Sequence, residues 1–231
     1  HDHVAAALEK GAVAAMVERP LDIAMPQLVV TDTRLALGRL AAAWRRQLGT
    51  PLVAVTGSNG KTTVKEMLSA ILAQRGPVLA TEGNLNNDIG LPLTLLRLAP
   101  GHRFAVLEMG ANHPGEIAYL TEIARPATAL ITNAGPAHLE GFGSIEGVAR
   151  AKGEIYSGLT PEGTAIINAD DAYAGLWDEL AHSHQRLHFG FREEAEVRTD
   201  PSALRFEIHE ERLCMPFRLV TPDGDADVRL P

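Results

Sequence analysis

The sequence is poor in cysteine and has no long apolar run. Cys214 is the single cysteine among 231 residues, so no disulfide can form within the chain, which is typical of a reducing compartment. No stretch reaches the roughly 18 uninterrupted apolar residues that a membrane-spanning helix needs. The amino end also lacks a basic run followed by an apolar core, the mark of an export signal. We therefore expect a cytoplasmic protein without a membrane span.

Basic side chains are in the minority as well. The chain has 21 Lys and Arg against 29 Asp and Glu, which gives a formal net charge of −8. Nucleic-acid surfaces are usually basic, so we expect no nucleic-acid partner. A hydrophobic share of 45% and a charged share of 22% are those of an ordinary globular protein and exclude a disordered chain. Pockets for small-molecule substrates remain possible in such a chain, and we expect it to be a monomer.

Short apolar runs alternate with segments of helical period from residue 52 onward. This alternation predicts an α/β fold, with a mostly parallel sheet and helices on both faces. The predicted strands are 52–55, 78–80, 104–107, 129–131 and 164–167. Between the first two, five apolar residues at helical spacing predict a helix that packs on the sheet. They are Val64, Met67, Leu68, Ile71 and Leu72.

The pattern changes at both ends of this region. Apolar residues from Leu37 to Leu48 predict another helix, which Gly49 and Pro51 end, so we place a domain boundary near residue 50. Residues 1–32 are too few for a core of their own and are expected to be the tail of a longer domain. After Asp171 we expect a helix to about residue 181 and a hairpin closed by the turn 221–224.

The first predicted strand runs into a glycine-containing loop that opens a helix. Such a loop can bind phosphate through its backbone amides. Gly57 and Gly60 allow close approach, Lys61 supplies a cation for the β- and γ-phosphates, and the Thr62 hydroxyl can bind Mg²⁺. The full GxxxxGK[ST] pattern is absent because position 55 is Val55. The loop reads Thr56-Gly57-Ser58-Asn59-Gly60-Lys61-Thr62-Thr63.

Three further polar residues stand out beside the predicted sheet. Glu108 ends a buried strand, where an unpaired carboxylate is costly; a Mg²⁺ shared with Thr62 would offset that cost, although the carboxylate could instead cap the next helix. His138 alone would more often be a hydrogen-bonded structural residue. Lys152 lies on the apolar stripe of a predicted helix, where it either extends its amine to water or enters a site.

The loop TGSNGKTT resembles the ATP loop of the Mur ligase family. Four further stretches carry the same resemblance: 83–92, 107–111, 132–140 and 151–155. The resemblance implies an ATP-binding central domain of the P-loop ATPase type over 50–231, incomplete at its carboxyl end, with the carboxyl-terminal domain absent. It also implies that 1–49 is the tail of an amino-terminal UDP-substrate-binding domain plus a connecting helix. The implied ATP-binding residues are Gly57, Ser58, Asn59, Gly60, Lys61, Thr62 and Thr63.

The resemblance also implies the catalytic and metal-binding groups. Lys61, Glu108, His138 and Lys152 would be catalytic. Two Mg²⁺ ions would be held by Thr62, Glu108, His138 and a carbamylated Lys152.

A loop rich in asparagine follows the second predicted strand. The resemblance suggests that Asn84, Asn86 and Asn87 contact the muramoyl-peptide substrate or a phosphate. Ordinary turn chemistry is the alternative for each of them.

The implied activity is ATP-dependent amide ligation in peptidoglycan precursor synthesis. D-alanyl-D-alanine would be added to a UDP-N-acetylmuramoyl tripeptide through an acyl phosphate. Another ligase of the superfamily, acting at a different stem-peptide step or in folylpolyglutamate synthesis, is one alternative, and an ATP-binding module without ligase activity is another. Because the chain lacks whole domains of the family, we expect it to bind ATP weakly and not to turn over alone.

Overall fold

The computed structural model describes residues 1–209 and 212–230, and its centre is a seven-stranded sheet in the order β4-β5-β3-β6-β7-β8-β9. Every neighbouring pair in this sheet is parallel, so the predicted α/β fold with a parallel sheet is confirmed. The strands are β3 (Leu52–Thr56), β4 (Val78–Ala80), β5 (Phe104–Glu108), β6 (Thr128–Ile131), β7 (Thr164–Asn168), β8 (Gln185–Gly190) and β9 (Val197–Arg198). The first five agree with the predicted runs to within one residue at either end.

Strands β8 and β9 were not predicted. They extend one edge of the sheet, and β8 begins with two exposed residues, Gln185 and Arg186. A strand near a sheet edge need not be apolar on both faces, so its sequence lacks the apolar run that marks a central strand.

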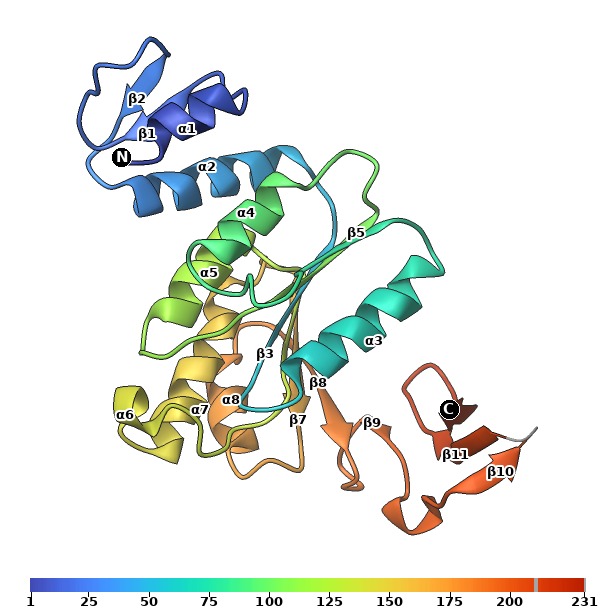
Figure 1. Ribbon diagram of the computed structural model, residues 1–231. Coiled ribbons are helices and arrows are strands. Elements are labelled where there is room, and N and C mark those ends of the chain that lie inside the picture. Colours follow the sequence, from blue (N-terminus) through green and yellow to red (C-terminus); the bar gives the residue numbers. More distant parts are fainter. Residues whose placement is uncertain (210–211, 231) are drawn as a thin grey trace.

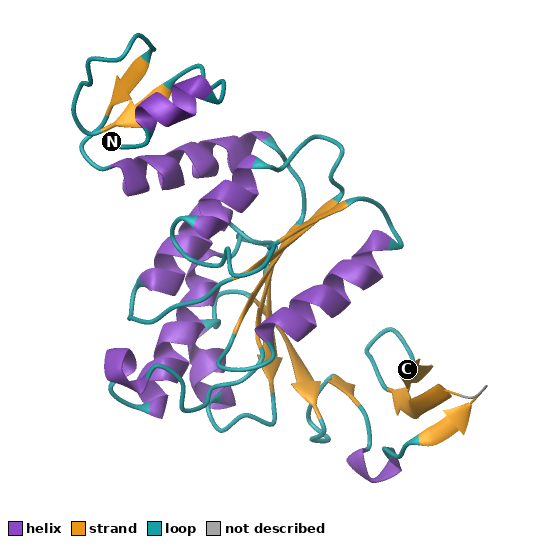
Figure 2. Cartoon of the chain, in the orientation of Figure 1, coloured by secondary structure: helices purple, strands orange, loops and turns teal. Residues whose placement is uncertain are grey.

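The helices cover the two faces of the sheet unequally (Figures 1 and 2). Helix α3 (Lys61–Ala73) lies on one face. The other face carries α4 (Gly90–Leu96), α5 (Glu116–Ala124), α7 (Ile145–Gly153) and α8 (Ala174–Leu180), with the short α6 (Leu139–Phe142) beside them. No helix in the described part of the chain has the length and apolarity that crossing a bilayer requires.

The prediction of the buried face of α3 was partly wrong. Met67 and Ile71 are 53% and 64% exposed, although both were expected to pack on the sheet. The buried face is instead centred nearer to Lys65, which is 2% exposed and whose ammonium donates to the carbonyl oxygen of Thr81 at the end of β4. Because the buried face is turned toward Lys65, Met67 and Ile71 lie at the margin of the contact between α3 and the sheet.

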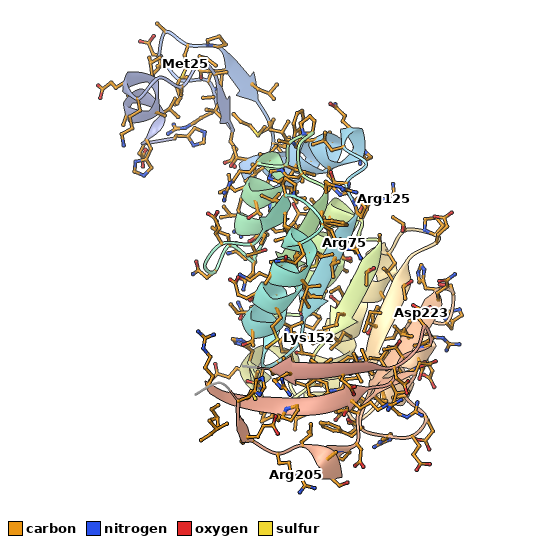
Figure 3. All side chains as sticks on the ribbon, turned by 90° about the vertical axis from the view of Figure 1, so that its right-hand side faces the viewer. Met25, Arg75, Arg125, Lys152, Arg205 and Asp223 are labelled. Carbon is orange, nitrogen blue, oxygen red and sulfur yellow. The ribbon has the colours of Figure 1, made fainter. Side chains whose placement is uncertain are left out.

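The amino-terminal segment forms a small unit apart from the main sheet (Figure 1). It comprises α1 (Val4–Glu9) and the parallel strands β1 (Ala15–Val17) and β2 (Gln27–Val29). Figure 3 shows Met25 in this unit and Lys152 in the main body.

Helix α2 (Thr33–Gln47) joins this unit to the main body. Asp32 caps it by accepting hydrogen bonds from the backbone amides of Arg34 and Leu35. The helix packs on α4 and α5, where Ala41 is fully buried and the Trp44 indole donates to the carbonyl of Leu98. The segment that we grouped with the amino-terminal domain therefore shares its last helix with the main core.

The described chain ends in three antiparallel strands, β10 (Glu207–His209), β11 (Arg212–Leu219) and β12 (Ala226–Leu230). The predicted hairpin with its turn at 221–224 is confirmed, and the Thr221 hydroxyl donates to the carbonyl of Gly224 across the turn. Figure 3 places Arg205 and Asp223 in this region. Cys214 is a buried residue of β11.

Close packing joins α5 to the short 3₁₀ helix η1 (Glu154–Gly158) that follows α7. The Thr121 hydroxyl donates to the carbonyl of Ile155 across this contact. A Cβ atom on Gly158 would lie 2.5 Å from the backbone carbonyl of Thr121. Glycine is therefore required there by the approach of two backbones.

We expect Gly158→Ala to lower the free energy of unfolding by about 2 kcal/mol, because backbone atoms would have to separate to admit the methyl group. Urea unfolding measures the change. Gly101→Ala is the matched control, since nothing lies within 4 Å of its added Cβ. Equal effects of the two substitutions would contradict this packing.

Candidate active site

The loop between β3 and α3 opens at the carboxyl edge of the sheet. Gly60 is the residue before the first turn of α3, and no side chain caps that end. The first-turn amides of a helix have no acceptor inside it, and they carry the positive end of the helix dipole. The start of α3 can therefore bind an anion such as phosphate.

The end of β6 holds this loop in place. The carbonyl and the side-chain oxygen of Asn133 accept the backbone amides of Ser58 (2.9 Å) and Asn59 (3.1 Å). The Thr132 hydroxyl donates to the Asn59 carbonyl at 2.6 Å, and a Cβ on Gly57 would collide with that hydroxyl. The amides of Ser58 and Asn59 thus already have acceptors, so the amides open to a ligand begin after them.

Lys61 folds back over its own loop. Its ammonium donates to the carbonyl oxygens of Gly57 at 2.8 Å and Ser58 at 3.3 Å, although the sequence predicts that it serves the nucleotide phosphates. Burial lowers the pKa of Lys61, and the nearby Glu108 carboxylate opposes this shift. To reach a phosphate, the ammonium would exchange these carbonyl oxygens for phosphate oxygens.

Glu108 lies at the end of β5 and is 3% exposed. Its two carboxylate oxygens accept hydrogen bonds from the Thr62 hydroxyl and the Asn86 side-chain amide, both at 2.8 Å. It does not cap the next helix; the amides of Gly115 and Ala118 at the start of α5 donate to Glu154 instead. A carboxylate touching a hydroxyl, with no ion pair in the described chain, is a donor set that suits Mg²⁺.

A cavity of about 790 Å³ lies beside this carboxylate, between the glycine loop, the asparagine loop and the start of α5. Thr62 and Glu108 are not part of its lining but adjoin it through Asn86. Eight predicted site residues line the cavity: Gly57, Ser58, Lys61, Asn84, Asn86, Asn87, His138 and Lys152. The structure thus brings predicted site residues from four separate stretches of sequence to one place.

His138 reaches the cavity from the loop after β6. Its backbone is left-handed, with φ 53°, and its side chain is exposed. Within residues 1–209 and 212–230 the imidazole makes no hydrogen bond, so it is not the bonded structural histidine of the alternative interpretation. The same residues contain no group of three carboxylate, imidazole or thiolate side chains placed to hold a metal ion. A metal at His138 would therefore need ligands beyond these side chains.

Lys152 enters the cavity from α7 and is 2% exposed. Its amine lies 5.6 Å from the centre of the Phe142 ring and does not extend to bulk water, contrary to the alternative interpretation. Burial lowers the pKa of Lys152 to about 8; the charge of Lys61 adds to this shift, and Glu116 and Glu154 oppose it. A neutral amine is thus accessible at ordinary pH.

The asparagine loop has two roles in the structure. The side-chain oxygen of Asn87 accepts the amides of Ile89 and Gly90 at the start of α4, which is the turn chemistry of the alternative interpretation. Asn86 instead donates to Glu108, and Asn84 lines the cavity without such a turn contact.

Sequence analysis missed the contribution of the amino-terminal segment to this site. Asp32 and Arg34, at the start of α2, line the cavity, and Arg34 forms an ion pair with Asp88 of the asparagine loop. These residues precede the glycine loop by more than twenty positions, and no motif links them to it. The sequence feature that could have pointed to them is that Asp32 and Arg34 are two charged residues just before a predicted helix.

The Mur ligase middle domain profile matches residues 55–231. The chain belongs to the Mur ligase family. Among relatives of this Mur ligase chain, the UDP-N-acetylmuramoyl-tripeptide--D-alanyl-D-alanine ligase of Escherichia coli (strain K12) is 51% identical over 231 residues, which cover 100% of this chain and 50% of the relative. The chain thus spans about half the length of the curated relatives that it matches.

Solved structures of the Mur ligase family have the same fold. MurF from Acinetobacter baumannii is 45% identical and superposes with a TM-score of 0.92, covering 100% of this chain and 49% of that chain. MurF from Thermotoga maritima, solved in complex with ADP, is 33% identical with a TM-score of 0.85, covering 99% and 52%. The α/β fold inferred from the sequence is therefore that of this family.

We expect Lys152→Met to raise the free energy of unfolding at pH 7 by an amount on the order of 3 kcal/mol, since the charged amine is buried only in the folded chain. The pKa is about 8 when folded and near its ordinary value when unfolded, so the unfolded chain binds more protons between these values. The wild type should therefore gain stability as the pH rises through this window, and the gap to the variant should shrink. Urea unfolding at several pH values in CO₂-free buffer measures this.

The control is the exposed Lys10, whose replacement by Met should leave a small, pH-independent difference. A gap for Lys152→Met that stays constant from pH 7 to pH 10 would contradict the assigned burial.

Proposed function

We propose that this chain supplies the ATP-binding half of a ligase that adds D-alanyl-D-alanine to a UDP-N-acetylmuramoyl tripeptide. The observation that carries the proposal is the cavity lined by the glycine loop and the asparagine loop, with the pair Thr62–Glu108 directly beside it. The names of the relatives support the assignment of the substrates, and the ADP in the Thermotoga maritima structure supports the assignment of an adenine nucleotide.

Amide formation at neutral pH requires an activated carboxylate. In the proposed reaction, the terminal carboxylate of the tripeptide attacks the γ-phosphate of ATP, which gives an acyl phosphate and ADP. The amine of D-alanyl-D-alanine then attacks the acyl carbon, loses a proton, and the tetrahedral intermediate releases phosphate. No covalent bond to the protein is needed, so positioning and electrostatics account for the catalysis.

Residues of the glycine loop would bind the nucleotide phosphates. The free first-turn amides of α3 face the anion, and Lys61 would leave the carbonyls of Gly57 and Ser58 to neutralise charge on the transferring group. The chain as a whole is acidic, at −8, so this local positive site is what would attract an anionic substrate.

Thr62 and Glu108 would hold one Mg²⁺, and His138 with a carbamylated Lys152 would support a second. When bound, the ions would supply positive charge that offsets the negative charge of the nucleotide phosphates. Carbamylation would turn the buried Lys152 cation into an anion, and its lowered pKa favours the neutral amine that reacts with CO₂.

The asparagine loop would orient the muramoyl peptide. Asn84, Asn86 and Asn87 line the cavity on the side of Arg34, whose guanidinium could meet a carboxylate of that substrate. The working protein would be a cytoplasmic monomer in peptidoglycan precursor synthesis.

The decisive experiment compares amine acceptors in a protein of the relatives' full length that contains these 231 residues. ATP-dependent phosphate release should require the UDP-muramoyl tripeptide and D-alanyl-D-alanine together. Lys61→Ala should reduce the rate at least 100-fold, because the transferring phosphoryl group loses its cation, while circular dichroism stays unchanged. Lys10→Ala, at an exposed site, is the control.

Preference for a single amino acid or for glutamate as acceptor would favour another ligase of the family. Nucleotide binding without any release of phosphate would favour a binding module. Retained activity in Lys61→Ala would overturn the role given to the loop. The 231-residue chain alone should bind ATP weakly and not turn over.

Carbamylation of Lys152 has its own test. With ¹³CO₂, a carbamate signal should appear in the ¹³C NMR spectrum and grow as the pH rises toward 8, since only the neutral amine reacts. Lys152→Arg should lack the signal, and added bicarbonate should not restore its ligase activity. An unchanged signal in this variant would assign the carbamate to another amine.

A further inference from the structure

We propose that Lys65 is a positioning residue that sets the geometry of Glu108 for the nucleotide-bound cation, without touching either ligand. This inference rests on the proposed function, because it concerns how the same site is held. Sequence analysis gave Lys65 no role, and the cavity lining does not include it.

Lys65 is among the most deeply buried charged residues in the described chain, at 2% exposure. It lies one turn after Lys61 on α3, on the side that faces the sheet. Its ammonium donates to the carbonyl oxygen of Thr81 at 2.8 Å and pairs with the carboxylate of its neighbour Glu66 at 2.5 Å. Glu66 is largely exposed, so Thr81 is the interior partner.

Stability alone does not explain a lysine at this position. Moving an ammonium out of water costs several kcal/mol, and apolar side chains of similar volume often replace buried ion pairs without loss of stability. Leu68 and Leu72, which lie on the same side of α3, show that apolar residues fit between this helix and the sheet. The acceptor that Lys65 reaches is therefore the informative feature.

Thr81 connects Lys65 to Glu108. The carbonyl of Thr81 accepts from Lys65, and its hydroxyl accepts the backbone amide of Glu108 at 2.9 Å. Thr81 is 1% exposed, and its own amide donates to the carbonyl of Val106 on β5. Lys65 thus fixes the residue that aligns the end of β5 with the end of β4.

The same residue also begins the asparagine loop. Asn86, five positions after Thr81, donates to one oxygen of Glu108, while Thr62 of α3 donates to the other. The carboxylate is therefore oriented by α3 and by the asparagine loop. The bond from Lys65 to Thr81 links α3 to the start of that loop. Without this bond, the strand end and the loop can shift relative to α3.

The test uses Lys65→Met in a protein of the relatives' full length that contains this chain. Calorimetry measures the binding of a non-hydrolysable ATP analogue over a range of Mg²⁺ concentrations. We expect the Mg²⁺ concentration for half-maximal affinity to rise about tenfold, the size of effect seen when a residue that orients a metal ligand is removed. Affinity without Mg²⁺ should not change, because the glycine loop and Lys61 remain.

Two readouts do not depend on the cation. The free energy of unfolding of Lys65→Met should stay close to that of the wild type, since the gain from removing a buried charge opposes the loss of the donor to the Thr81 carbonyl. Hydrogen exchange at the Glu108 amide should become at least tenfold faster, because its acceptor Thr81 is no longer fixed. Thr81→Val should raise the half-maximal Mg²⁺ concentration by a similar factor, and the double variant should be no worse than either single one.

Glu66→Gln is the matched control, because it removes the ion pair and leaves the bond to Thr81; it should behave as wild type. Unchanged Mg²⁺ dependence in Lys65→Met, or an equal loss of affinity with and without Mg²⁺, would overturn the inference. If the proposed function itself is wrong, the wild type would bind the analogue without any effect of Mg²⁺. That result would overturn both the proposed function and the role of Lys65.

Discussion

A carboxylate buried at the end of a central strand is the constraint on which this site depends. Glu108 is 3% exposed, and a carboxylate removed from water must find partners. The partners come from two elements: Thr62 from the first turn of α3 and Asn86 from the loop after β4. The hydrogen bonds to the Glu108 carboxylate therefore hold the phosphate-binding loop and the predicted substrate loop close together, beside a cavity large enough for a ligand.

The glycine loop is held in its shape by contacts within the protein. Asn133 uses its carbonyl and its side chain to fix Ser58 and Asn59, and Lys61 rests on the loop's own carbonyls. The loop therefore does not need to fold around its ligand, which keeps the entropic cost of binding low. The exchange required on binding is limited to the ammonium of Lys61.

Much of this was predictable from the sequence, for physical reasons. Central strands are buried on both faces, so their apolar runs predicted β3, β5, β6 and β7. The edge strand β4 also has a short apolar run, whereas β8, which lies next to the opposite edge, has none. The glycine loop and Glu108 lie at strand ends, which meet at one edge of a parallel sheet. Helical spacing predicted α3 but not which of its faces is buried, because the acceptor for Lys65 is a carbonyl that is distant in sequence. Arg34 was missed because tertiary packing, not a motif, brings α2 to the cavity.

Helix α3 lies alone on its face of the sheet because of the handedness of the connections between parallel strands. Right-handed crossovers assign a helix to a face according to the direction in which the chain travels along the sheet. In the order β4-β5-β3-β6-β7-β8-β9, the step from β3 to β4 runs toward one edge, and every later step among the described strands runs toward the other. Chirality thus separates α3 from the crossover helices α4, α5, α7 and α8, and the reversal of direction next to β3 opens the crevice in which the glycine loop lies.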